Sequence, residues 1–108
     1  MLTYAAWTDL PGLHHGFLDR AECGDGPPWE AAVARAGAVA PVAVPRQVHG
    51  TRIVTATSAA DRPEADGLVT AEAPRLVGVV TADCVPVLIL DRARHVAAAV
   101  HAGWRGQV

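Results

Sequence analysis

The sequence has no lysine, only two cysteines and no long hydrophobic run. All nine basic residues are arginine and the formal net charge is -2, so no broad basic surface points to nucleic acid or an anionic membrane as a partner. The longest uncharged apolar run, residues 85–90, contains Pro86 and is far shorter than the roughly 20 residues of a membrane-spanning helix. We therefore expect a protein that binds neither nucleic acid nor membrane.

A secretory signal is also missing from the start of the sequence. The first nine residues contain neither a basic segment nor a long apolar segment. In the reducing cytoplasm, thiols remain unpaired. Cys23 lies in a Gly/Asp-rich stretch and Cys84 between apolar runs, which does not favour a bridge between them. The sequence therefore predicts a cytoplasmic protein with two free cysteines.

The composition is that of a folded domain. Of the 108 residues, 51% are hydrophobic and 19% are charged, whereas disordered chains have low hydropathy and high net charge. The length suits one domain, and neither a repeat nor a linker divides the chain. We treat residues 1–108 as a single unit.

One helix and several strands are expected. Residues 28–36 favour a helix because Pro28 suits its first turn, the following alanines have high helix propensity and Gly37 can end it. Before this helix we expect a strand at residues 2–7 and a loop at 23–28. The other expected strands cover residues 42–44, 52–57, 68–70, 76–80, 85–90 and 95–100, with a turn at 66–67.

Two of these strands, residues 76–80 and 85–90, are almost continuously apolar. Such runs are typical of strands buried on both faces in a layered arrangement. The predicted fold class is α/β (α+β), a layered mixed β-sheet with a flanking helix. Since one helix cannot cover both faces of such a sheet, we expect self-association or a complementing chain.

Three short polar segments follow or precede apolar strands, at residues 46–50, 81–84 and 101–106. Strand ends are where ligands bind in open α/β sheets. His49, Cys84 and His101 in these segments suit a zinc site that leaves a fourth position open. They also suit a cysteine nucleophile activated by histidine. Residue type alone favours a third interpretation, an inert buried thiol beside hydrogen-bonded histidines. Their spacing alone does not decide between these interpretations.

Further polar residues in the same segments are candidates for substrate binding. Arg46 and Arg105 suit forked hydrogen bonds to phosphate, although an ion pair at the surface is an equal interpretation for Arg46. Asp83 suits substrate binding or the orientation of a ligand histidine, and it equally suits a turn at a strand end. Asp66 is more typical of a side chain that fixes a turn. Trp104 is expected to pack rather than to stack on a base.

Four motifs carry a resemblance to a known family. They are Arg-Gln-Val-His-Gly at 46–50, Ala-Asp-Gly-Leu-Val-Thr at 65–70, Thr-Ala-Asp-Cys-Val-Pro at 81–86 and His-Ala-Gly-Trp-Arg-Gly at 101–106. In this order the chain resembles the laccase-domain family. Its members are also called multicopper polyphenol oxidoreductase-like proteins, peptidoglycan editing factors or YfiH-type purine nucleoside phosphorylases. Because members continue well past the last motif, the chain resembles the N-terminal portion of that fold.

The resemblance implies a metal site and an activity. The family's ligands fall on His49, Cys84 and His101, which the resemblance also makes the catalytic residues, with zinc or copper as the metal. The implied activities are phosphorolysis of adenosine, inosine and methylthioadenosine, and adenosine deamination. Polyphenol oxidation with copper is a further family activity, although the sequence lacks the histidine-rich pairs of a multi-copper cluster.

We therefore expect a purine nucleoside phosphorylase with adenosine deaminase activity, whose partners are a purine nucleoside and phosphate. Two alternatives stay open. In one, Cys84 attacks an amide of a peptidoglycan precursor with His101 or His49 as its base. In the other, the chain is an inactive metal-binding fragment that needs a partner chain. Since the sequence stops two residues after the last motif, we expect weak or no phosphorylase activity of the chain by itself.

Overall fold

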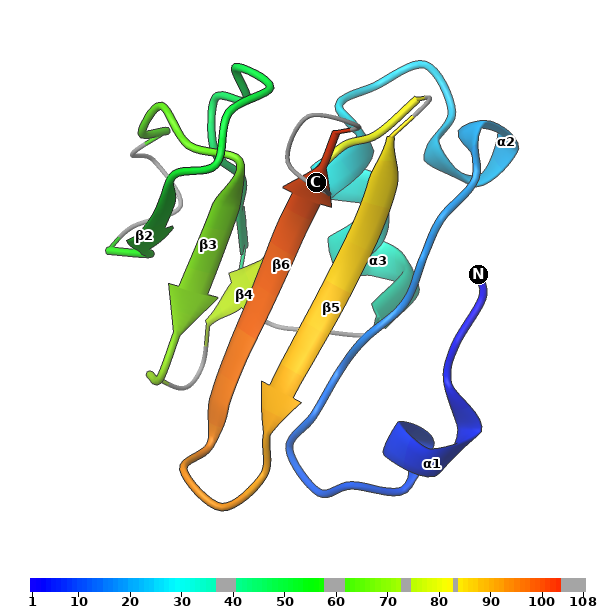
Figure 1. Ribbon diagram of the computed structural model, residues 1–108. Helices are drawn as coiled ribbons and strands as arrows, with labels where there is room; N and C mark the ends of the chain where they lie inside the picture. Colours follow the sequence, from blue (N-terminus) through cyan, green and yellow to red (C-terminus); the bar gives the residue numbers. More distant parts are fainter. Residues whose placement is uncertain (37–40, 58–61, 73–74, 83, 104–108) are drawn as a thin grey trace. The chain divides into compact units, whose positions relative to one another are not determined.

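The computed structural model describes residues 1–36, 41–57, 62–72, 75–82 and 84–103 of the chain (Figure 1). The chain divides into two compact units, Met1–Pro41 and Val42–Val108, and each unit is described by itself. Among the described residues, no helix has the length and apolar character needed to cross a membrane.

The described residues of the first unit form three short helices, α1 (Ala5–Thr8), α2 (Arg20–Cys23) and α3 (Pro28–Ala36). Helix α3 has the predicted bounds. The strand expected at residues 2–7 is wrong, because only Leu2 pairs, through a bridge to Phe17, and the next residues turn into α1. A local hydrogen bond from the Trp7 amide to the Tyr4 carbonyl closes that turn, so local bonding prevails over the apolar pattern.

The loop expected at residues 23–28 is shorter than predicted, because Cys23 ends α2 and Pro28 begins α3. A capping box starts α2. The Asp19 carboxylate accepts a hydrogen bond from the Glu22 amide at 2.9 Å, and the Glu22 carboxylate accepts one from the Asp19 amide at 3.2 Å. This Asp-x-x-Glu pattern is a recognised helix start in sequences, and it is the signal that the sequence prediction overlooked.

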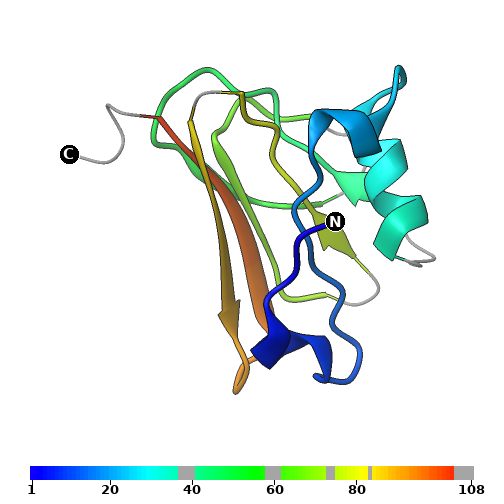
Figure 2. The same cartoon turned by 90° about the vertical axis from the view of Figure 1, so that its right-hand side faces the viewer.

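The second unit consists of six strands in the described part of the chain. They are β1 (Val42–Ala43), β2 (Ile53–Thr55), β3 (Gly67–Thr70), β4 (Leu76–Val77), β5 (Val85–Asp91) and β6 (Val96–Ala102). Strands β1 and β4 form a parallel pair, and the other four form a sheet in the order β2-β3-β6-β5 (Figures 1 and 2). Because β2 and β3 are parallel and the other neighbours antiparallel, the sheet is mixed. The predicted mixed α/β class is confirmed.

The register of this sheet brings distant residues together at one end. In the β5–β6 hairpin, Val85 lies opposite Ala102 and Pro86 opposite His101. On the other side of β6, Gly67 of β3 lies opposite Val100. The residues just before β3, just before β5 and at the end of β6 therefore share one end of the sheet, as antiparallel pairing requires.

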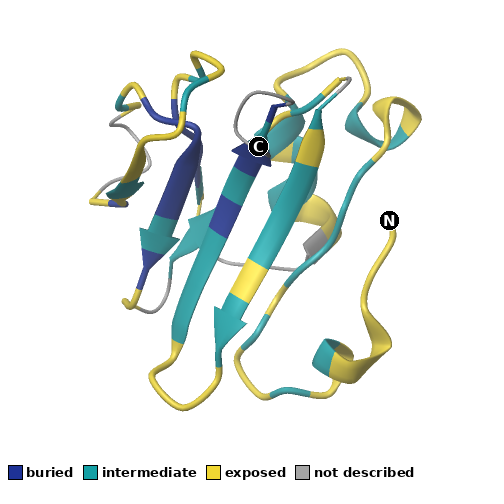
Figure 3. Ribbon diagram, in the orientation of Figure 1, coloured by how far each residue is buried: buried dark blue, intermediate teal, exposed yellow. Residues whose placement is uncertain are grey.

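The core of this unit is small, and buried residues gather along β3 (Figure 3). Ala43, Ala56 and Leu68 are buried together, with Val54 and Val77 packed against them. Burial of strand 85–90 on both faces is a wrong prediction: Val85 and Ile89 are 48% and 53% exposed. Strand β5 is the last in the sheet order of the described residues, and these two exposed residues lie on the same face of it. A continuously apolar run does not reveal whether one face or both are covered.

The strand expected at residues 76–80 is also shorter, because β4 ends at Val77. Beyond it, the backbone of Val80 pairs with a side chain instead of a strand. The Val80 amide donates to Oε1 of Gln47 at 2.7 Å, and Nε2 of Gln47 donates to the Val80 carbonyl at 2.5 Å. Gln47 thereby ties the loop before β2 to the segment that leads to β5.

Candidate metal centre

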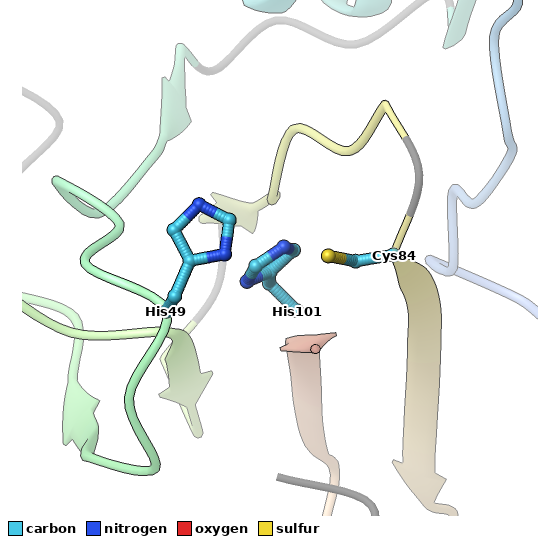
Figure 4. Close-up of side chains that lie close together, drawn as sticks. All are labelled: His49, Cys84 and His101. Atoms are coloured by element: carbon cyan, nitrogen blue, oxygen red, sulfur yellow. The ribbon is translucent and has the colours of Figure 1, made fainter. Parts of the chain in front are cut away.

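His49, Cys84 and His101 converge at the shared end of the sheet. Their donor atoms all lie within 4.8 Å of one another, and the three side chains point toward one another (Figure 4). Each comes from a different element: His49 from the loop before β2, Cys84 from the position before β5, and His101 from β6. The donor atoms of this cluster are close enough to one another to bind a single ion.

The cluster is buried on one side and open on the other. His101 is buried, Cys84 is half-buried and His49 is exposed. The two imidazole rings meet edge to face, with ring centroids 5.0 Å apart and an interplanar angle of 81°. Among the described residues of the cluster, His49 is therefore the one exposed to solvent.

The loop that carries His49 is held in an unusual conformation. His49 has a φ of 61°, in the left-handed region that few residues other than glycine adopt. Three successive amides of this loop donate to the Asp66 carboxylate: Val48 at 3.2 Å, His49 at 3.0 Å and Gly50 at 2.9 Å. These three bonds offset the backbone strain and fix the loop.

The same carboxylate contacts the other histidine. Oδ2 of Asp66 lies 2.7 Å from Nδ1 of His101, and both side chains are 2% exposed. Burial alone raises the pKa of the Asp66 carboxyl, but the hydrogen bonds from the loop amides and the His101 ring outweigh it and leave that pKa below its ordinary value. Because an ionised carboxylate only accepts hydrogen bonds, Nδ1 of His101 is the donor. In the neutral ring, Nε2 of His101 then carries a free electron pair.

The predicted turn at residues 66–67 is wrong. Gly67 is already the first residue of β3, and the Asp66 side chain bonds to the loop at residues 48–50 instead of its own turn. Sequence reasoning assigned the orientation of a histidine to Asp83, which lies outside the described residues, and missed Asp66. The available signal was its position inside one of the four motifs, directly before an apolar strand.

The other candidate residues do not join the cluster in the described part of the chain. Arg46 forms an ion pair with Glu64 at 2.8 Å, and their side chains are 65% and 57% exposed. This is the surface ion pair considered as the alternative for Arg46. Arg105, Trp104 and Asp83 lie outside the described residues, so their roles stay predictions.

One sulfur and two imidazole nitrogens suit a borderline or soft metal such as zinc or copper. The space beside the donors supports this fit, because it is lined by a residue without a side chain. A Cβ atom added at Gly103 would lie 3.8 Å from Sγ of Cys84 and 4.0 Å from Nδ1 of His49. The described residues therefore fit a single ion with a coordination position left for another molecule.

Substitution of this glycine tests the space. We expect Gly103→Ala to fold normally, because the methyl group meets its neighbours at ordinary van der Waals distances. The methyl group covers the thiol, so alkylation of Cys84 by iodoacetamide in the metal-free chain should slow several-fold. Peptide mass spectrometry follows the rate at Cys84, with the rate at Cys23 as the internal reference. An unchanged ratio of the two rates would show that Gly103 does not border the accessible side.

Comparison with known proteins relates this chain to one protein family and to several curated relatives. Residues 29–108 match the family model described as multi-copper polyphenol oxidoreductase laccase. The purine nucleoside phosphorylase of Clostridium acetobutylicum is 48% identical over 61 residues, which cover 56% of this chain and 26% of that protein. A purine nucleoside phosphorylase of Mycobacterium tuberculosis is 48% identical over 66 residues, which cover 56% of this chain and 25% of that protein. The match thus spans about a quarter of the length of these curated relatives.

Solved structures show the same relationship. A protein of the DUF152 family from Neisseria meningitidis superposes with a TM-score of 0.65 and 37% identity, over 88% of this chain and 43% of that protein. YlmD of Geobacillus stearothermophilus superposes with a TM-score of 0.62 and 30% identity, over 73% of this chain and 33% of that protein. The fold of this chain is therefore similar to part of the fold of both proteins.

Proposed function

This chain belongs to the multi-copper polyphenol oxidoreductase laccase family, and from that membership we propose that it acts as a purine nucleoside phosphorylase with a metal site at His49, Cys84 and His101. The convergence of these three donors within 4.8 Å is the observation that carries the proposal. The names of the relatives support purine nucleosides and phosphate as substrates.

We propose zinc as the ion and copper as the second choice. In the described part of the chain, His49, Cys84 and His101 are the one group of donors close enough to hold an ion. A multi-copper cluster needs several further histidines, so the described residues favour a mononuclear site and give polyphenol oxidation little support. When bound, such an ion supplies Lewis-acid chemistry: it polarises an oxygen atom or lowers the pKa of water.

The chain's own residues account for substrate binding in this proposal. Phosphorolysis breaks the bond between the purine nitrogen and the ribose carbon, and a phosphate oxygen forms the new bond to that carbon. We propose that Arg46, Arg105 and Asp83 line the binding site, with the two guanidinium groups holding the phosphate. Arg46 must then exchange its exposed partner Glu64 for phosphate oxygens, which costs little because surface ion pairs are weak.

Adenosine deamination is the second activity that we propose for the same site. In this reaction an oxygen atom from water replaces the amino group on the purine ring, and ammonia leaves. In this proposal the purine ring enters beside the exposed His49, and His101 serves as a ligand through Nε2. The hydrogen bond between Nδ1 of His101 and Asp66 keeps the imidazole ring from rotating.

One observation favours a second candidate function, amide hydrolysis with Cys84 as nucleophile. Asp66 contacts His101 as the carboxylate contacts the base in a nucleophile–base–carboxylate arrangement, with Cys84 as the nucleophile. Enzymatic activity that a chelator removes and added zinc restores favours the phosphorylase. Enzymatic activity that survives treatment with the chelator favours the amide hydrolase. Alkylation of Cys84 stops both and does not separate them.

The proposal predicts phosphate-dependent release of hypoxanthine from inosine by the zinc-loaded chain. We expect a slow rate, since the matched region spans about a quarter of the curated relatives. Dialysis against a chelator should abolish the release, and zinc should restore it. Chromatography of the purine products with and without phosphate measures the effect. Release of hypoxanthine that depends on neither phosphate nor zinc would contradict the phosphorylase assignment.

A further inference from the structure

We propose that Asp66 is the positioning residue of the metal centre, because one buried carboxylate sets the geometry of both histidines. The inference rests on the proposed function, since it gives His49 and His101 the role of ligands. Asp66 accepts four hydrogen bonds, three from the loop at residues 48–50 and one from the His101 ring. The two histidines are 52 positions apart in the sequence, yet they share this single partner.

Asp66 acts on His49 through the backbone. The left-handed φ of His49 turns its side chain toward the cluster, and the three amides around it all point at the carboxylate. Without an anion at that position, the three amide donors would lose their partner and the loop would relax to a less strained conformation. The His49 ring would then leave the neighbourhood of Cys84.

Asp66 acts on His101 through the ring. By accepting the Nδ1 proton at 2.7 Å, the carboxylate selects the tautomer in which Nε2 is unprotonated. Only an unprotonated ring nitrogen binds a metal, and the hydrogen bond at the opposite nitrogen also fixes the orientation of the ring. Asp66 therefore determines which atom of His101 faces the cluster and in which protonation state.

The carboxylate is well placed for this role because its backbone is anchored to the sheet. The Asp66 amide donates a hydrogen bond to the Arg52 carbonyl at 2.9 Å, and the His101 amide donates one to the Asp66 carbonyl at 2.6 Å. Asp66 is 1% exposed. Main-chain bonds to the segments on both sides hold the side chain between the two histidines.

The test is Asp66→Asn, which keeps the size of the side chain but exchanges one acceptor oxygen for an NH₂ donor. If that NH₂ group faces His101, it donates to Nδ1 and drives the ring proton to Nε2, the wrong atom for metal binding. It also meets the His49 amide, which is a second donor. In the opposite orientation it meets the amides of Val48 and Gly50. Either orientation breaks part of the arrangement.

The first readout is the tautomer of His101 in the metal-free chain, measured by the ¹⁵N chemical shifts of its ring. In the wild-type chain we expect protonated Nδ1 and unprotonated Nε2. In Asp66→Asn we expect the reverse, because the orientation with the NH₂ group toward His101 faces one amide donor, whereas the opposite orientation faces two. The second readout is Co²⁺ affinity, followed by the sulfur-to-cobalt absorption of Cys84. We expect a loss of about 10–100-fold in Asp66→Asn, the usual effect of removing a partner of a metal-binding histidine.

Thr70→Val is the matched control. Thr70 is also a buried polar residue at the other end of β3, and its hydroxyl bonds to the backbone of Glu72 instead of the cluster. We expect this variant to keep both the His101 tautomer and the Co²⁺ affinity of the wild-type chain. Equal losses of affinity in the two variants would assign Asp66 a merely structural role and overturn the proposal.

The tautomer measurement also separates this inference from the proposed function. A wild-type chain with protonated Nε2 on His101 overturns the role of Asp66, and this result needs no variant that folds. A wild-type chain with unprotonated Nε2 but no affinity for Co²⁺ or zinc refutes the metal site, while the positioning of His101 by Asp66 stands.

Discussion

Replacement of Cys84 by alanine should abolish stoichiometric zinc binding while the chain stays folded. Cys84 contributes the one sulfur donor of the cluster and, in the alternative function, the nucleophile. Its side chain is half-buried and Sγ lies among the donors instead of in the apolar core, so alanine should cost only about 1 kcal/mol of unfolding free energy. Zinc content after gel filtration and circular dichroism give the two readouts.

Cys23→Ala is the matched control for this experiment. Cys23 is the other free cysteine, and it ends helix α2 in the first unit. We expect this variant to bind one zinc ion per chain, the same stoichiometry that we expect of the wild type. Zinc binding by Cys84→Ala at wild-type affinity would remove Cys84 from the proposed ligands, and turnover at the wild-type rate would also remove it from catalysis.

The two histidines should differ in their effect on stability, although both are proposed ligands. His101→Ala removes the buried partner of the Asp66 carboxylate and leaves a cavity. We expect it to lose zinc binding and about 2–3 kcal/mol of unfolding free energy. His49→Gly removes an exposed side chain at a φ of 61°, a conformation that glycine adopts readily. It should lose zinc binding but change stability by less than about 1 kcal/mol.

Urea denaturation of the metal-free variants separates these contributions from that of the ion. A large loss of stability in His49→Gly would mean that the His49 ring is a structural element of the loop. A His101→Ala chain as stable as the wild type would mean that Asp66 does not depend on the His101 ring. Either result would require a different account of the buried side of the cluster.

Local signals in the sequence predicted part of this fold well. Helix α3 has the predicted bounds because Pro28 and the alanines after it act within the helix itself. The strands β5 and β6 also lie near their predicted positions. The exposure of β5 to solvent was not predictable, because the apolar run at residues 85–90 is compatible with an edge strand and with a central strand. Only the sheet order shows that β5 is the last strand.

The convergence of His49, Cys84 and His101 was predictable from the sequence, whereas the residue that supports them was not. These three residues stand out because they lie at expected strand ends and because the family resemblance places its ligands on them. Asp66 did not stand out, since an Asp-Gly pair is more often a turn. Its role depends on tertiary pairing, which places the loop at residues 48–50 and the end of β6 on the two sides of one carboxylate. Gln47 is a similar case, because its partner, the Val80 backbone, lies 33 residues away.

The central claim is that one ion is shared by His49, Cys84 and His101, and X-ray absorption at the zinc edge tests it directly. For the wild-type chain loaded with one equivalent of zinc, the account predicts one sulfur neighbour at about 2.3 Å and nitrogen or oxygen neighbours at about 2.0–2.1 Å. The sulfur signal should vanish in Cys84→Ala. A spectrum of the wild-type chain with only nitrogen and oxygen neighbours, or with more than one sulfur neighbour, would contradict the account.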